Sequence, residues 1–218
     1  MILGLSFGCC YKFIKTKNYN DIITFYRENF PDINAIELII PKKFLKQFEL
    51  SKKNYEWLSN LKHISYHLLN QDCYFEEKRV IQKLPKIDYI VCHVDLHYKI
   101  PEWFLDMYYD KIIIENIVND ENYSFDYAKR ICFDTSHAIE TGGKYIHNFL
   151  SYYGNKIKQV HLSDYKKKNV HIPFYKESKM FEHIKGFIDL KKYSIIIESV
   201  CNNLNELKKE YKFIKDNI

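Results

Sequence analysis

The sequence predicts an α/β protein built as a compact (β/α)8 barrel, a TIM barrel with short helices and loops. Short β-branched or aromatic runs alternate eight times with longer amphipathic stretches rich in Lys and Glu. Two runs, Ile112–Ile114 and Ile195–Ile197, are wholly apolar, as expected of parallel strands buried on both faces. The 218 residues suit one domain with a single core. Because a typical barrel has about 250 residues, helices and loops are expected to be short.

Strands are expected where β-branched and aromatic residues cluster. Helix-length segments separate these clusters, which predicts parallel strands joined by crossover helices rather than by hairpins. In chain order the expected strands are Ile2–Phe7, Ala35–Ile40, His63–His67, Tyr89–His93, Lys111–Glu115, Arg130–Asp134, Lys158–Leu162 and Ser194–Glu198.

The segments between the strands have the apolar spacing of amphipathic helices. A doubly wound open sheet would also alternate strands and helices, but Phe7-Gly8-Cys9-Cys10 after the first strand is not a dinucleotide fingerprint. No composition shift marks a domain boundary, so residues 1–218 are expected to form one domain. The expected helices are Tyr19–Asn29, Lys43–Asn60, Cys73–Lys83, Pro101–Tyr109, Tyr123–Ala128, Ala138–Tyr153, Ser178–Leu190 and Asn203–Asn217.

Composition excludes several classes of protein. With 46% hydrophobic and 28% charged residues, the chain is neither disordered nor a disulfide-built miniprotein. Among 33 basic residues only Arg27, Arg79 and Arg130 are arginines, so the net charge of +5 does not indicate DNA recognition by arginine. Six scattered cysteines without a CxxC spacing, and the lack of a signal peptide or a bilayer-length apolar run, predict a cytoplasmic protein with no membrane partner. The sequence predicts no oligomeric state.

The ends of the expected strands carry the main functional signal. Seven of the eight strands end in a residue that can bind a metal ion: Glu37, His67, His93, Glu115, Asp134, His161 and Glu198. In a parallel barrel these carboxyl ends lie on one rim, where active sites are found. We therefore expect a single site, with Glu115, Asp134, His161 and Glu198 as its metal ligands.

Three further residues are candidates for this site. His137 follows Asp134 by three residues, Asp164 follows His161 by three, and His171 lies in the next loop. Together with His67, His93 and Glu37, they are candidates for additional metal or substrate contacts. Mixed carboxylate and imidazole ligands are typical of Mn²⁺, Zn²⁺, Fe²⁺ or Co²⁺. The expected cofactor is thus one to three such ions.

Several segments resemble the xylose-isomerase-like TIM barrel superfamily. The most specific are Ile114-Glu115-Asn116, Phe133-Asp134-Thr135-Ser136-His137-Ala138 and Val160-His161-Leu162-Ser163-Asp164. The superfamily includes AP endonuclease family 2 (endonuclease IV-like proteins) and sugar phosphate isomerases and epimerases. The resemblance implies a metal core of Glu115, Asp134, His161 and Glu198. In the endonuclease branch a trinuclear zinc cluster has further ligands, which match His67, His93, His137 and His171. The Asp expected two residues before His171 is replaced by Asn169, a poorer zinc ligand.

Two activities, and one inactive alternative, follow from this resemblance. The first is a sugar or sugar phosphate isomerase or epimerase, in which Glu115 and Glu198 transfer protons through a metal-stabilised enediolate. The second is zinc-dependent phosphodiester hydrolysis at abasic DNA. Glu37, the scarce arginines and the short chain favour the isomerase and a small-molecule substrate. The third is a degenerate metal-binding barrel without catalysis.

Overall fold

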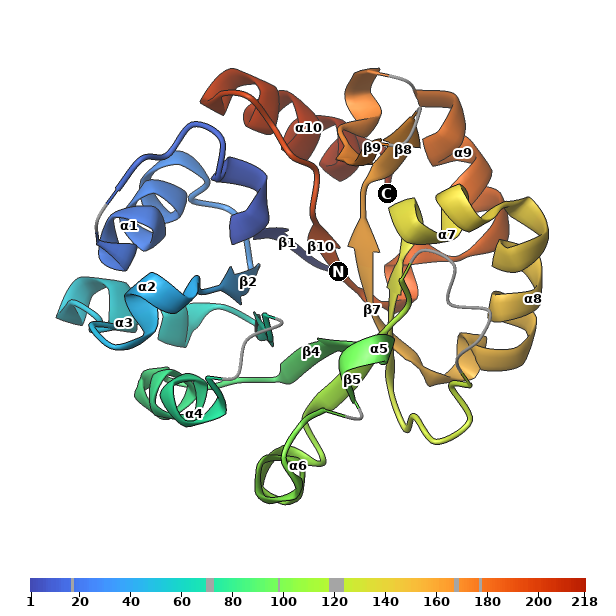
Figure 1. The fold of residues 1–218 in the computed structure, drawn as a ribbon. Helices are drawn as coiled ribbons and strands as arrows, with labels where there is room; N and C mark the ends of the chain where they lie inside the picture. Colours follow the sequence, from blue (N-terminus) through green and yellow to red (C-terminus); the bar gives the residue numbers. More distant parts are fainter. Residues whose placement is uncertain (17, 70–72, 98, 118–123, 167–168, 177) are drawn as a thin grey trace.

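The strands close into a parallel barrel, which confirms the predicted (β/α)8 fold (Figure 1). The computed structural model describes residues 1–16, 18–69, 73–97, 99–117, 124–166, 169–176 and 178–218. Around the ring the order is β1, β10, β7, β6, β5, β4, β3 and β2. The barrel strands are β1 Ile2–Ser6, β2 Ala35–Ile39, β3 His63–His67, β4 Tyr89–His93, β5 Ile112–Glu115, β6 Ile131–Asp134, β7 Ile157–Leu162 and β10 Ser194–Ile197.

Helices surround the barrel on its outer side (Figure 1). They are α1 Tyr19–Asn29, α2 Lys42–Leu45, α3 Lys52–Asn60, α4 Tyr74–Lys83, α5 Val94–His97, α6 Glu102–Tyr108, α7 Thr135–Thr141, α8 Gly143–Tyr153, α9 Ser178–Phe187 and α10 Leu204–Asn217. Short 3-10 turns are η1 Phe7–Cys10, η3 Gly154–Lys156, η4 Phe174–Lys176 and η5 Leu190–Lys192. Among the described residues, no helix combines the length and apolar character needed to span a bilayer.

Two predicted helices are each divided in two. The predicted helix 43–60 is interrupted because Ser51 caps a new helix, accepting a hydrogen bond from the Asn54 amide at 3.3 Å. The predicted helix 138–153 begins earlier, at Thr135, because the Asp134 carboxylate caps it. It then breaks at Gly142, whose φ of 122° is readily accessible only to glycine.

The predicted helix 123–128 is wrong over its described part. Residues 124–128 are not helical, with a turn at Asp126 and Tyr127, and Tyr123 lies outside the described residues. The Ser124 hydroxyl accepts a hydrogen bond from the Asp126 amide at 3.1 Å and donates one to the Asp126 carboxylate at 2.9 Å. Such local side-chain bonds compete with helical ones and favour a turn.

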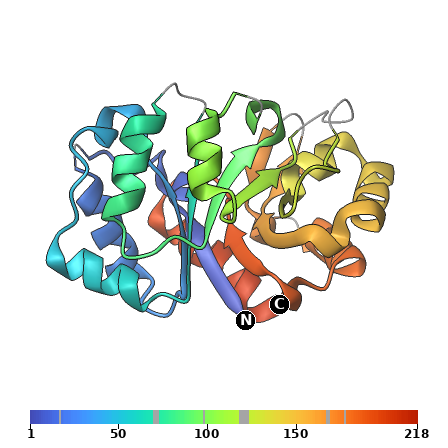
Figure 2. The ribbon, with the colours of Figure 1, turned by 90° about the horizontal axis from the view of Figure 1, so that it is seen from below.

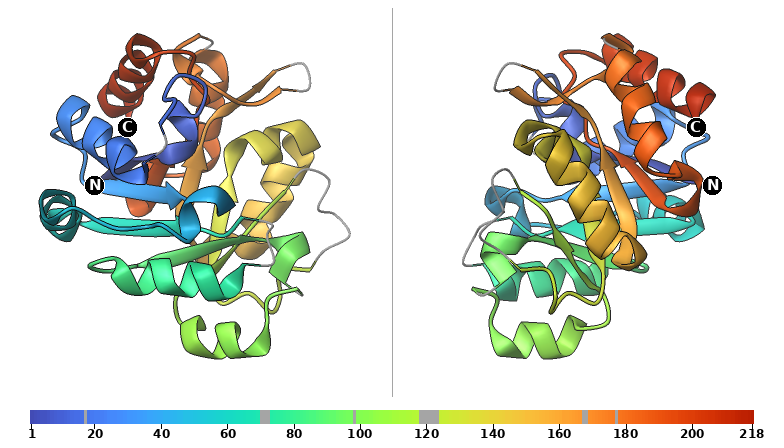
Figure 3. Two further views of the ribbon diagram at one scale, coloured as in Figure 1. Left: turned by 60° about the vertical axis from the view of Figure 1, so that its left-hand side comes forward. Right: turned by 90° about the vertical axis from the view of Figure 1, so that its right-hand side faces the viewer.

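One hairpin was not predicted. Strands β8 (Asp164–Lys166) and β9 (Asn169–Ile172) pair antiparallel after β7 and project from the barrel (Figure 3). Both strands are short and lack a clear alternation of apolar and polar residues, so the sequence pattern does not reveal them. Asn169 is exposed and pairs with Lys166 in this hairpin.

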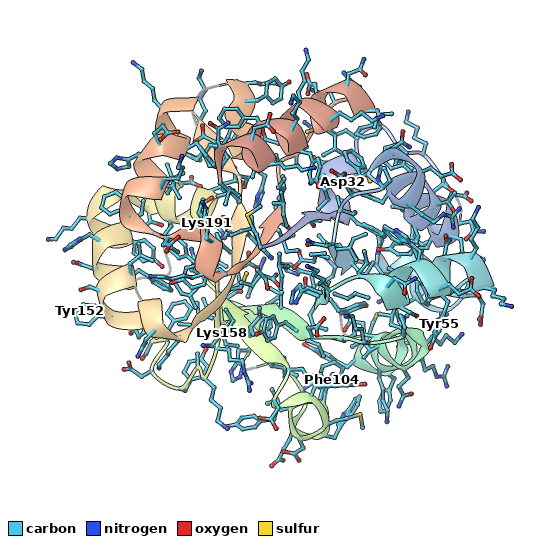
Figure 4. The ribbon with its side chains drawn as sticks, turned by 180° about the vertical axis from the view of Figure 1, so that it is seen from behind. Asp32, Tyr55, Phe104, Tyr152, Lys158 and Lys191 are labelled. Atoms are coloured by element: carbon cyan, nitrogen blue, oxygen red, sulfur yellow. The ribbon has the colours of Figure 1, made fainter. Side chains whose placement is uncertain are left out.

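The main apolar core lies between the sheet and the helices, while the inside of the barrel holds a small separate apolar cluster. Val91, Ile113 and Cys132 form that cluster, with Tyr89 packed against it. Both chain termini lie at the same end of the barrel (Figure 2). Lys158 and Lys191 belong to the face seen from behind in Figure 4, opposite to the face of Figure 1. The apolar cluster occupies only part of the barrel interior. Polar side chains occupy the rim at the carboxyl ends of the strands.

Candidate metal centre

Strand register places the predicted ligands next to one another on the rim. His93 of β4 is the direct neighbour of Glu115 on β5, and Asp134 of β6 is the neighbour of His161 on β7. Side chains two residues apart on a strand share a face, so the residues that precede these ligands by two also face the barrel interior. The barrel therefore concentrates carboxylates and imidazoles in one layer, as the sequence predicts.

The carboxylate of Glu115 is the centre of the cluster. Its Oε2 lies 2.8 Å from His67 Nε2 and 3.3 Å from His93 Nε2. Its Oε1 lies 2.7 Å from His161 Nδ1. Glu198 adds a second carboxylate, with Oε2 at 3.0 Å from the same nitrogen of His161. The two oxygens of Glu115 thus face two different sets of imidazoles.

Glu37 lies behind His161 rather than in the open part of the site. Its Oε2 is 2.8 Å from His161 Nε2 and accepts hydrogen bonds from Ser65 Oγ at 3.0 Å and Gln159 Nε2 at 2.9 Å. All four residues are fully buried. Glu37 therefore orients His161, and its partner Gln159 in turn contacts His63 inside the barrel.

Asp134, His137 and His171 form a second group beside the first. Asp134 Oδ1 accepts hydrogen bonds from the His137 amide and from Ser136 Oγ, each at 2.8 Å. Its Oδ2 has no hydrogen-bond partner among the described residues, although it is buried. His171 Nδ1 lies 3.9 Å from that oxygen and 3.8 Å from Glu198 Oε2. The unpartnered oxygen is thus available to an incoming ligand.

Backbone contacts determine which nitrogen of each histidine can bind a metal ion. His67 Nδ1 lies 3.0 Å from the Leu68 carbonyl, and His137 Nδ1 lies 2.9 Å from the Asn116 carbonyl. A carbonyl oxygen only accepts, so both Nδ1 atoms carry a proton, and Nε2 is the nitrogen that can bind a metal ion once it has lost its own proton. Such second contacts are typical of histidines that ligate metals.

Three groups of side chains have ligand atoms close enough to share one ion. Within each group the ligand atoms lie within 4.8 Å of one another. The groups are His67, Glu115 and His161; Asp134, His137 and His171; and Glu115, Asp134, His161 and Glu198. Glu115, His161 and Asp134 each belong to two of these groups.

Charge pairing in the cluster outweighs the effect of burial on its pKa values. Burial by itself raises the pKa of a carboxyl group and lowers that of an imidazole. Despite burial, neighbouring histidines lower the pKa values of the Glu37, Glu115 and Asp134 carboxyl groups. The Glu115 carboxylate raises the pKa of His67 to about 9 against burial. The site therefore favours carboxylates paired with cations, whether these are imidazolium groups or metal ions.

The structure brings most predicted site residues together. His93 and Glu37 lie outside the three groups but are close to them, His93 at 3.3 Å from Glu115 and Glu37 at 2.8 Å from His161. Asp164 also lies outside the groups; its Oδ1 accepts a hydrogen bond from the Tyr165 amide at 2.7 Å, at the start of β8.

Gln159 and Asn116 also support the cluster and were not among the predicted site residues. Gln159 precedes His161 by two residues and so shares its face, a signal that the strand pattern contains. Asn116 donates to and accepts from the Asp134 backbone, at 3.0 and 2.7 Å.

Comparison with known proteins supports the fold. No protein-family model and no curated protein sequence matches the chain. Among solved structures, orotidine 5'-monophosphate decarboxylase from Sulfolobus solfataricus is 14% identical with a TM-score of 0.50, covering 98% of this chain and 97% of that one. Phosphoribosyl anthranilate isomerase from Thermotoga maritima is 12% identical with a TM-score of 0.47, covering 98% and 100%. The first likeness shows a shared barrel fold, and the second adds nothing to the argument. The chain is a (β/α)8 barrel with a carboxylate and histidine cluster at the carboxyl ends of its strands.

Proposed function

We propose that the chain is a divalent-metal-dependent hydrolase of phosphoesters, with at least two ions that share Glu115. The arrangement of Glu115 is the observation that carries this proposal. One of its oxygens faces His67 and His93, and the other faces His161, whose Nδ1 also contacts Glu198. A carboxylate placed between two ligand sets is suited to bridge two ions. Paired ions are typical of phosphatases and nucleases.

The donor set fits Mn²⁺, Zn²⁺, Fe²⁺ or Co²⁺, because it mixes imidazole nitrogens with carboxylate oxygens. Asp134 Oδ2 is buried and has no hydrogen-bond partner among the described residues, so a bound cation would compensate for the burial of this oxygen. When bound, such ions supply a nucleophile from water near neutral pH and stabilise charge on the phosphoryl group. Glu115, Asp134, His161 and Glu198 would hold the central ion. His67 and His93 would complete one neighbouring site, and His137 and His171 the other.

The remaining residues position this cluster. The Glu37 carboxylate would accept a hydrogen bond from His161 Nε2, which leaves Nδ1 for the central ion. Asn116 binds the Asp134 backbone and the His137 ring, so it holds two members of the second group together. The hydroxyl of Ser163 lies 3.1 Å from His171 Nδ1. These contacts hold the ligands in a geometry that a phosphoester can approach from the rim.

An isomerase or epimerase is the second candidate, because one ion alone could use the central group. Glu115 Oε1 and Glu198 Oε2 lie 2.7 and 3.0 Å from the same His161 nitrogen. With one ion bound by that group, these two carboxylates would be placed to move a proton between the faces of a sugar. His67 would then contact substrate hydroxyls rather than a metal.

Metal content and hydrolysis, measured on the same preparations, separate the two candidates. Purified protein is loaded with Zn²⁺ or Mn²⁺, and its metal is counted by mass spectrometry. Hydrolysis is then followed with bis(4-nitrophenyl) phosphate and with a duplex that contains one abasic site. We expect two or more ions per chain and metal-dependent cleavage of at least the first substrate. One ion and no cleavage would overturn the hydrolase proposal and favour the isomerase.

His67→Ala sharpens this test. Under the hydrolase proposal it removes a ligand of one ion, so both the ion count and the hydrolysis rate fall, the latter by at least about a hundredfold. His147→Ala, at an exposed position of α8, is the matched control and leaves both values unchanged. An unchanged ion count in His67→Ala would contradict the assignment of His67 as a metal ligand.

A further inference from the structure

A cavity of about 620 Å³ lies at the rim, beside the metal centre. The turn η1 and the segment after it form one side, and the end of β2 with α2 forms the other. Most lining side chains are apolar, among them Phe7, Ile14, Ile39 and Phe44. The volume is within the range of pockets that bind small organic ligands.

Gly8 lines the cavity and also lies close to Glu198 of the metal centre. A Cβ atom placed on this glycine would lie 3.9 Å from Glu198 Oε1 and 3.3 Å from Ile39 Cδ1. Because Gly8 has no side chain, only its backbone lies between the cavity and the Glu198 carboxylate. The cavity and the metal centre are thus neighbours on the two sides of Gly8.

Charge at the cavity favours an anionic ligand. Lys15 and Lys43 belong to the lining and are exposed to solvent. The Lys43 ammonium also lies 4.8 Å from the centre of the Phe44 ring. An aromatic ligand could stack on that ring while the lysines attract its negative charge.

We propose that this cavity binds the organic group of the substrate, and that this group is a flat aromatic ring such as an aryl group or a nucleobase, joined to the phosphoester at the metal centre. The inference rests on the proposed hydrolase function for the phosphoester end of the substrate. The assignment of an aromatic ring rests on the cavity itself, because apolar and aromatic walls favour a ring over a sugar hydroxyl or a short alkyl group.

Binding of two phosphate monoesters tests the cavity separately from turnover. Phenyl phosphate and methyl phosphate carry the same charged group and differ in the ring. Their affinities for the Mn²⁺-loaded protein are measured by titration calorimetry. We expect phenyl phosphate to bind at least about tenfold more tightly, since stacking on an aromatic side chain gives an effect of that size.

Two variants assign any such preference to the cavity. Phe44→Ala removes the aromatic wall, and Ile14→Trp fills the space. Each should reduce the preference for the phenyl ester to less than about threefold while methyl phosphate binding stays unchanged. Phe75→Ala, 69% exposed on α4, is the control and should retain the preference. Circular dichroism and thermal unfolding verify that all three variants fold.

The outcomes distinguish this inference from the proposed function. Equal affinity for the two esters, absent binding of phenyl phosphate, or a preference that survives both cavity variants would overturn the aromatic pocket. A preference that both variants remove, in a protein that hydrolyses no phosphoester, would support the pocket and refute the hydrolase.

Discussion

Replacing Glu115 by Gln should make the metal-free protein less stable in a pH-dependent way. The carboxylate contacts His67 Nε2 at 2.8 Å and His161 Nδ1 at 2.7 Å, and all three side chains are buried. Gln keeps the size of the side chain but removes the charge that stabilises protonated imidazoles. The loss should therefore be greatest at a pH at which those imidazoles carry a proton.

The size of the effect follows from His67. Burial lowers its pKa, but the neighbouring carboxylates, Glu115 foremost and then Glu37 and Glu198, raise it from the ordinary 6.5 to about 9. At about 1.4 kcal/mol for each pH unit, this difference corresponds to ~3 kcal/mol. A pKa that is raised by folding contributes stability that is complete below about pH 6.5 and is lost as the pH rises through 9. We expect Glu115→Gln to lose ~2–3 kcal/mol at pH 6 and less than ~1 kcal/mol at pH 10.

Urea unfolding in the presence of a chelator, followed by circular dichroism from pH 6 to pH 10, measures these free energies. Glu28→Gln is the control, since Glu28 is an exposed partner of Arg27 and its loss should cost less than ~1 kcal/mol at every pH. An equal loss for Glu115→Gln at pH 6 and pH 10 would refute the coupling between Glu115 and His67.

Three further predictions concern separate parts of the molecule. Glu198→Gln should abolish activity while thermal unfolding and circular dichroism stay close to those of the unmodified chain; full activity would exclude Glu198 from the site. Gly4→Ala should lower the free energy of unfolding in urea by at least ~2 kcal/mol, because the new Cβ would clash with the Ala35 carbonyl oxygen. Gly186→Ala in α9 meets no atom within 4 Å and should raise the free energy of unfolding by ~0.5–1 kcal/mol. Glu210→Ala should destabilise by ~2–4 kcal/mol, since its carboxylate accepts hydrogen bonds from two backbone amides and one hydroxyl; a loss below ~0.5 kcal/mol would contradict that role.

The barrel could be predicted because its signal is repeated along the chain. Apolar strands such as Ile112–Glu115 are buried on both faces, and each ends at the rim by the geometry of parallel sheets. The non-helical segment 124–128 and the hairpin could not be predicted in the same way. Their structure depends on single contacts, such as that of Ser124 with Asp126, which periodicity does not contain.

That these side chains gather at one rim was predictable, but their individual contacts there were less so. Their positions at strand ends predict that Glu37 and Glu115 share a rim. They do not predict that Glu37 contacts Nε2 of His161 whereas Glu115 contacts Nδ1. That distinction depends on partners such as Gln159 and Ser65, which come from other strands. Asp164 follows the same spacing rule as His137 but belongs to a hairpin, so its side chain is placed by β8 and not by the rim.

The β8–β9 hairpin gives the site a modular construction. His67, His93, Glu115, Asp134 and His161 lie on barrel strands, whereas His171 comes from the hairpin, where its φ is 59° and its carbonyl accepts the Val200 amide at 2.7 Å. A chain with a shorter connection after β7 would keep the members of the cluster that lie on strands and lose His171. Changes in one surface insertion would therefore alter the composition of the cluster, with no change in the barrel that carries it.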